Sequence, residues 1–228
     1  MLGLTLIAVL GVVLAGCDGS RVTAPERISA AIASPLPSPT SQGFGVLDKH
    51  NNQVFISMTP WVALPAGGGT MQATSAGLSK AFITIGPMTA MTTGSIDTTG
   101  SAVTTTVRVK GIDIKALVNV DSLVAVSQSN GNGTVAASNS NGSAFFGLTV
   151  LGVPFGPQMP APNTRINFPG GQGSVILNEQ IKTGDGVQTT GLTVNMVHLF
   201  IQSDNTEVII GSSMSGVQST LPGVIVFP

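Results

Sequence analysis

The stretch Ala102-Val103-Thr104-Thr105-Thr106-Val107-Arg108-Val109 decides the fold class, because its side chains alternate in character. One face of an extended chain would carry Val103, Thr105, Val107 and Val109, and the opposite face would carry Thr104, Thr106 and Arg108. Successive side chains of a β-strand point to opposite sides, so a period of two predicts a strand with one buried face and one solvated face.

The same kind of segment recurs on both sides of this stretch. Short runs of β-branched residues are separated by turn residues, and no segment keeps a helical apolar period over three turns. We therefore expect an all-β protein, with a β-sandwich as the first choice and an irregular β-helix or a split barrel as alternatives. The expected strands are residues 45–47, 53–58, 81–85, 102–109, 112–126, 143–150, 173–178, 192–201, 207–213 and 224–227.

Two places in this pattern predict a change of direction. The alternation breaks within residues 112–126, so we expect a bulge or a tight turn near residues 119–122. Residues 127–143 contain two patches rich in Asn, Gly and Ser around a weak strand, which indicates a hairpin or a subdomain junction.

The composition excludes a nucleic-acid-binding function. Only 8% of the residues are charged, with 9 Lys and Arg against 10 Asp and Glu, where about 25% is usual for soluble domains. A nucleic-acid-binding surface needs clustered Lys and Arg to displace counterions, and this chain has no such cluster. Cys17 is the only cysteine, so no disulfide can form within the chain.

The beginning of the chain predicts a lipid anchor. An apolar run from Leu2 ends in Leu14-Ala15-Gly16-Cys17, the pattern of a lipobox, in which residues 1–16 are a lipoprotein signal peptide and Cys17 is lipidated. A diacylglyceryl group and an N-acyl chain would hold the protein on a membrane without spanning it. An uncleaved anchor helix and an ordinary signal peptide are the alternatives, and a start upstream of Met1 stays open.

The segment after the lipobox predicts a tether between the anchor and a folded domain. Residues 17–42 are rich in Ser, Ala and Pro and lack the density of apolar residues that a core requires. We expect the all-β domain to occupy residues 43–228, outside the cytoplasm, at the cell envelope or cell surface.

Few residues offer catalytic chemistry. The chain has two histidines, His50 in a hydrophilic turn and His198 in an apolar strand, and neither lies in a recognisable nucleophile motif. We expect His198 to be a hydrogen-bonded structural residue. Glu179 and Asp185 could form a carboxylate pair, but a role in satisfying loop backbone groups is the preferred interpretation of both. No spacing of ligands predicts a metal or cofactor, and we expect no catalytic residue.

One segment carries a family resemblance. It consists of Pro160-Ala161-Pro162-Asn163-Thr164-Arg165-Ile166-Asn167-Phe168-Pro169-Gly170, followed by Val175-Ile176-Leu177-Asn178-Glu179-Gln180, Thr183-Gly184-Asp185-Gly186 and two further strands. Residues 143–217 resemble the C-terminal half of the choice-of-anchor P family. The resemblance implies an exported β domain fixed to the cell surface, here through Cys17, and it brings no catalytic residue or ligand.

Physical reading of the same segment predicts its local structure. Residues 157–162 are rich in proline, which cannot donate to a strand ladder, so we expect an extended crossover. Residues 178–180 should end a strand. A buried Glu179 would need partners, and we expect loop amides or Arg165.

These observations favour a lipid-anchored protein of the cell surface or envelope with a structural, adhesive or interaction role and no catalysis. Its expected partners are the membrane, an envelope or extracellular-matrix component, or a second copy of the chain through strand edges. The alternative is an extracytoplasmic carbohydrate-binding domain or hydrolase that uses a groove around Trp61, His198 and Glu179.

Overall fold

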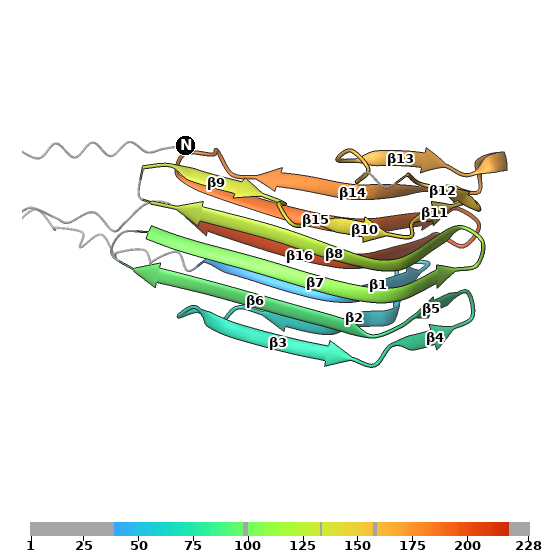
Figure 1. Cartoon of the computed structure of the whole chain (residues 1–228), viewed down its shortest axis with the longest axis horizontal. Helices are drawn as coiled ribbons and strands as arrows, with labels where there is room; N and C mark the ends of the chain where they lie inside the picture. Colours follow the sequence, from blue (N-terminus) through green and yellow to red (C-terminus); the bar gives the residue numbers. More distant parts are fainter. Residues whose placement is uncertain (1–38, 98–99, 133, 157–158, 219–228) are drawn as a thin grey trace, which may run out of the picture. The chain divides into compact units, whose positions relative to one another are not determined.

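The structure, a computed structural model, describes residues 39–218 except 98–99, 133 and 157–158, and it is an all-β sandwich (Figure 1). Two antiparallel sheets, not closed into a barrel, pack on each other. The first has six strands in the order β13 (Thr164–Asn167), β14 (Gly173–Thr183), β15 (Thr189–Ile201), β16 (Thr206–Gln218), β1 (Thr40–His50) and β2 (Gln53–Ala63). The expected fold class is confirmed.

The second sheet has ten strands. Its main path is β12 (Val153–Pro154), β11 (Thr149–Val150), β8 (Val118–Gly131), β7 (Gly100–Ile114), β5 (Ile83–Ile85) and β4 (Leu78–Lys80). Off this path, β6 (Met88–Asp97) pairs with β7 and with β3 (Gly69–Ser75), while β9 (Ala136–Asn139) and β10 (Ala144–Phe146) pair with β8. A short 3-10 turn, η1 (Pro169–Gly171), lies between β13 and β14.

The core lies between the two sheets and follows the pattern expected for β7. On that strand Val103, Thr105, Val107 and Val109 are buried, while Arg108 is exposed. The apolar cluster also includes residues from β1, β8, β15 and β16, which places the two sheets in contact along their central strands.

Part of the interior is lined by hydroxyl groups instead of apolar side chains. The Thr105 hydroxyl donates to the Met214 carbonyl at 2.8 Å, and the hydroxyls of Ser129 and Ser215 lie 2.8 Å apart. Ser41 on β1 contacts Thr105 across the interior. These hydrogen bonds join the two sheets where the apolar cluster ends, because buried hydroxyls need partners.

A line of irregular positions crosses the six-stranded sheet. The strand pairing is regular on both sides of this line but skips the four residues on it, which are Asn178 on β14, Met196 on β15, Gly211 on β16 and Gly45 on β1. Asn178 and Gly211 have positive φ angles of 50° and 66°. The core positions of β15 are 192, 194 and 196 before this line and 197 and 199 after it, so the alternation of side chains reverses there.

Several boundaries differ from the expectations. The chain reverses direction at residues 115–117, within the stretch expected as a single strand at 112–126; there Ala116 has a φ of 58° and the Leu117 N–H donates to the Ile114 carbonyl at 2.8 Å. Residues 119–122 lie inside β8, and the irregularity expected there is present: the pairing with β7 skips Asp121 and Gly111, and the buried positions change from 118 and 120 to 123 and 125.

Other elements also begin or end at residues that differ from the expected ones. Residues 40–42, expected in the tether, begin β1, since Ser41 is buried against the hydroxyls of the second sheet. Residues 178–180 do not end a strand, because β14 continues its pairing with β15 as far as Thr183. β3 and β6 were not expected at all. The region 127–143 forms a hairpin, in which β8 pairs with β9.

Some expectations fall outside the part of the chain that the structure describes. These are the signal peptide at residues 1–16, lipidation of Cys17, nearly all of the tether, part of the crossover at 157–162 and the strand at 224–227. Within the described ranges, no helix has the length and apolar character required to cross a bilayer.

Candidate functional site

A row of polar and charged side chains crosses four strands on the face of the six-stranded sheet that points away from the core. We call this set, Glu179, Asn195, His198, Glu207 and Lys49, the His198 row. The His198 ring nitrogens contact a carboxylate on each side, with Nδ1 2.8 Å from Glu179 Oε2 and Nε2 3.0 Å from Glu207 Oε1. Lys49 Nζ donates to Glu207 Oε2 at 3.0 Å, and Asn195 Nδ2 donates to Glu179 Oε2 at 2.6 Å.

The reversal of side-chain alternation creates this arrangement. Asn195 and His198 are three residues apart, so on a regular strand they would point to opposite faces. Because Met196 and Val197 are both core residues, Asn195 and His198 instead reach the same acceptor, Glu179 Oε2.

The contacts of the row shift the pKa values of Glu179, Glu207 and His198. The hydrogen bond with His198 is the largest cause that lowers the pKa of Glu179, and it outweighs the effect of burial. Burial acts to raise the pKa of Glu207, but hydrogen bonds from Lys49 and His198 lower it. Burial acts to lower the pKa of His198, yet its contacts with Glu179 and Glu207 raise it. A protonated imidazole between two carboxylates is the state that these contacts favour.

This geometry suits cohesion of the sheet better than catalysis. A general base needs a ring nitrogen that can accept a proton from a substrate, and both nitrogens of His198 are engaged by carboxylates of neighbouring strands. His198 is hydrogen-bonded, as expected.

The expected partners of Glu179 were wrong. Arg165 lies on β13, where its Nε donates to Asn167 Oδ1 at 3.2 Å, and the partners of Glu179 are His198 and Asn195. The reason is the register, which places Glu179 opposite Asn195 on the neighbouring strand, while Arg165 pairs with Ile176.

His50 belongs to a second cluster, next to the β1–β2 turn. Its Nε2 lies 3.0 Å from Asp48 Oδ1, its Nδ1 lies 2.8 Å from Thr206 Oγ1, and its ring meets that of Phe55 edge-on at 4.9 Å. Burial raises the pKa of Asp48, although His50 opposes this effect. Within the described ranges, no three His, Cys, Asp or Glu residues are grouped to hold a metal ion.

Asp185 satisfies the backbone of its own turn, as expected. Its Oδ1 accepts from the N–H groups of Val187, Gln188 and Thr189 at 3.0, 2.8 and 2.8 Å, and these bonds lower the pKa of Asp185 to about 2. Glu179 precedes this turn by four strand residues, roughly 13 Å at the usual rise of a strand. The two carboxylates therefore do not form the pair that glycoside hydrolysis requires.

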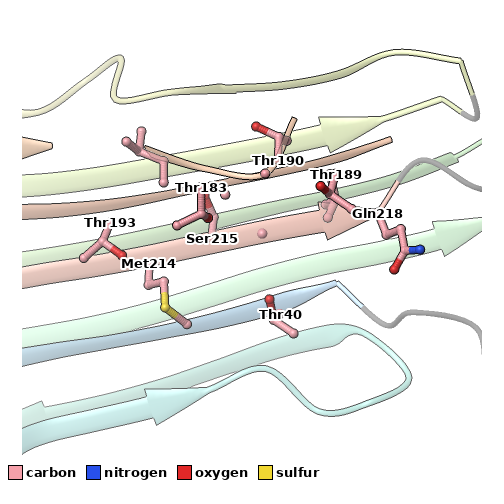
Figure 2. A pocket seen from close by; sticks show the side chains of 13 residues that line it. Thr40, Thr183, Thr189, Thr190, Thr193, Met214, Ser215 and Gln218 are labelled. Carbon is pink, nitrogen blue, oxygen red and sulfur yellow. The ribbon is translucent and has the colours of Figure 1, made fainter. Parts of the chain in front are cut away.

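A hollow of about 330 Å³ lies at the end of the six-stranded sheet next to the β14–β15 turn (Figure 2). Its centre is formed by Gly191 and Gly216, which are paired in register, and Thr183 and Thr40 stand beside them. A side chain on Gly191 would meet Thr183 Oγ1 at 2.4 Å, and one on Gly216 would meet Thr40 Oγ1 at 2.9 Å. Further lining residues are Thr189, Thr190, Thr193, Met214, Ser215 and Gln218, and no residue of the lining is charged.

Trp61 is not part of a common groove with the His198 row. The register row that contains Trp61 on β2 runs through Phe44 and Ser212 to Asn195 and then Glu179. Four strand spacings of about 4.8 Å separate its ends, roughly 19 Å. The expected grouping is therefore correct for His198 and Glu179 and wrong for Trp61.

Sequence reasoning missed three members of the row: Asn195, Glu207 and Lys49. One signal was available, since Glu207 and His198 are the only charged or titratable residues of β15 and β16. Their neighbouring strands are joined by a short turn, which brings such residues close together.

Comparisons of the chain with protein-family models, with curated proteins and with solved structures returned no match. The resemblance to the choice-of-anchor P family stays a prediction.

Proposed function

We propose that this protein is a lipid-anchored component of the cell surface or envelope, with a structural, adhesive or interaction role and no catalytic activity. The observation that carries the proposal is the His198 row. The histidine best placed for acid–base chemistry has both nitrogens bound to carboxylates, and the row ties β14, β15, β16 and β1 together. A rigid sheet with neutral surfaces suits display and contact.

The anchoring part of the proposal rests on the sequence. Leu14-Ala15-Gly16-Cys17 is a lipobox, and the resemblance to the choice-of-anchor P family implies an exported domain whose members differ in their anchors. The domain described here begins with β1 at Thr40, which leaves residues 18–39 between Cys17 and the first strand.

Intact mass and membrane fractionation test the anchor directly. The wild-type chain and the Cys17→Ala variant are expressed in a bacterial host and fractionated in parallel. We expect a lipid-sized mass increment on a chain that starts at Cys17, found with the membranes and lost in the variant. An unmodified wild-type protein in the soluble fraction would contradict the anchoring proposal.

A second candidate function is the binding of a neutral sugar, and the hollow over Gly191 and Gly216 favours it. Threonine hydroxyls can hydrogen-bond to sugar hydroxyls, while their methyl groups and Met214 can contact the apolar face of a ring. Calorimetric titration with a glycan panel would test this candidate. Saturable binding that is lost in Thr193→Val but kept in Thr106→Val on β7 would support it, and absence of binding across the panel would remove it.

A further inference from the structure

Four large apolar side chains are exposed on β2. Val54 is 58% exposed, Phe55 68%, Met58 40% and Trp61 51%, and we call this set the β2 strip. β2 is the last strand of the six-stranded sheet in the described part of the chain, and its sequence, Gln53–Ala63, contains no charged residue. Edge strands are normally protected by charges, so this strip calls for a partner.

Addition of a strand from another chain does not fit this edge. The pairing of β1 with β2 shifts register twice, between Val46 and Asp48 and again between Asp48 and Lys49. Bulges of this kind bend the edge away from a regular ladder. Pro60 also removes one backbone donor from the strand. The strip is therefore suited to contact through its side chains.

The area of the strip is too small for a stable dimer. With ~200 Å² for a large apolar side chain, the exposed fractions of the four residues leave about 400 Å² of surface. A specific protein interface buries about 800 Å² on each partner. A second copy of the chain would thus need much more surface than the strip offers.

We propose that the β2 strip contacts the surface of the membrane to which the protein is anchored. This inference rests on the proposed lipid anchor at Cys17, which would keep the domain beside a bilayer. Trp and Phe favour the boundary between headgroups and acyl chains. Two charged residues face β2 in register: Lys49, opposite Val54, is bound to Glu207, and Asp48, opposite Ile56, is buried and lies 3.0 Å from His50, whose ring contacts Phe55. The contact is therefore apolar and independent of salt.

The emission of Trp61, the only tryptophan, reports on this contact. The Cys17→Ala protein, produced without the signal peptide at residues 1–16 so that it carries neither the apolar run nor a lipid, is titrated with phosphatidylcholine vesicles, and its partition is measured by fluorescence and by flotation. We expect a blue shift that saturates with lipid and persists in molar NaCl. The lipidated wild type on the same vesicles should show the same shift.

Two substitutions in the Cys17→Ala background locate the contact. Phe55→Ser should weaken vesicle partition about tenfold, because burial of an exposed aromatic ring is lost. Phe146→Ser on β10 is the matched control, since Phe146 is 55% exposed on the other sheet, and it should leave partition unchanged. Val54→Ser provides a second variant of the strip, and circular dichroism verifies the fold of each protein.

Three results would overturn the inference: Trp61 emission that does not change when the lipidated protein is on vesicles, an equal effect of Phe55→Ser and Phe146→Ser, or a concentration-dependent dimer that Phe55→Ser disrupts. The last result would assign the strip to a second copy of the chain. If mass spectrometry finds no lipid on Cys17, the anchor proposal fails, while the vesicle titration of the Cys17→Ala protein still decides the fate of the strip.

Discussion

Replacement of His198 by Gln should destabilise the protein in a way that depends on pH. The wild-type imidazole donates to Glu179 and Glu207, and glutamine can replace at most one of these bonds while it carries no charge. A hydrogen bond to a charged group contributes about 1.5–3 kcal/mol, and loss of one partner from a fully buried ion pair costs about 3–5 kcal/mol.

The surroundings of the row set the size of the effect. The side chains of His198 and Glu179 are 11% and 14% exposed, but Glu207 is 29% exposed and keeps its contact with Lys49. Solvent screening at the Glu207 end weakens that half of the interaction. We therefore expect His198→Gln to lower the free energy of unfolding by about 2 kcal/mol near pH 5.5.

The sign of the pH dependence follows from linkage. The pKa of His198 is raised by folding, so its contribution is complete below the unfolded value near 6.5 and is lost as pH rises through the folded pKa. The pKa values of Glu179 and Glu207 are lowered, so their contributions exist above about 4.5 and are lost as pH falls through the folded values. The row contributes most between about pH 4.5 and 6.5.

Urea denaturation followed by circular dichroism at pH 5.5 and pH 9 would measure the difference between wild type and His198→Gln. We expect a smaller difference at pH 9, where the neutral imidazole donates only one hydrogen bond. The exposed Lys110→Gln serves as the control for loss of a charge and should change little at either pH. A difference that is the same at both pH values would refute the ionic account and assign the loss to packing.

Two further predictions concern Gly211, where the backbone has a positive φ, and the turn that contains Asp185. Gly211→Ala should destabilise the protein by about 2–4 kcal/mol, because φ is 66° and the new Cβ would lie 2.4 Å from Leu123 Cδ1. Gly186→Ala shares a positive φ but has open space, so thermal unfolding should show a loss of only about 1 kcal/mol; equal losses would exclude the contact with Leu123 as a cause. Asp185→Asn should lower the melting temperature at pH 7, and because the pKa of Asp185 is lowered to about 2, the difference should vanish as pH falls below that value. A difference that persists at pH 1.5 would show that the carboxylate charge is not involved.

The fold class could be predicted because one face of each long strand is buried. The alternation of apolar and polar residues in β7 matches the burial of their side chains, since Val103, Val107 and Val109 lie in the interior as the pattern predicts. The β7–β8 turn could not be predicted, since Lys115-Ala116-Leu117 contains none of the residues that favour turns. Ala116 adopts its φ of 58° because the pairing of the two long strands outweighs its local preference.

The His198 row could be predicted only in part for a related reason. The apolar neighbours of His198 predict that its ring is hydrogen-bonded. Which residues bind the ring depends on the register of the strands and on the reversal of side-chain alternation at Met196. A regular strand would have placed Asn195 in the core and His198 outside it, or the opposite. Since the reversal involves Asn178 and Gly211 on the neighbouring strands, no single segment of sequence contains the information.

The reversal also connects the fold with the proposed function. In a chain with only 8% charged residues, the His198 row engages two acids and a lysine with one another across four strands. The neighbouring surfaces of the same sheet are then left with hydroxyl-bearing and apolar side chains, in the hollow over Gly191 and Gly216 and in the β2 strip. Contacts made through such surfaces depend on shape and on apolar area, so they should change little with ionic strength. The two proposed partners, a bilayer surface and a neutral sugar, therefore share one prediction, which is binding that is insensitive to salt.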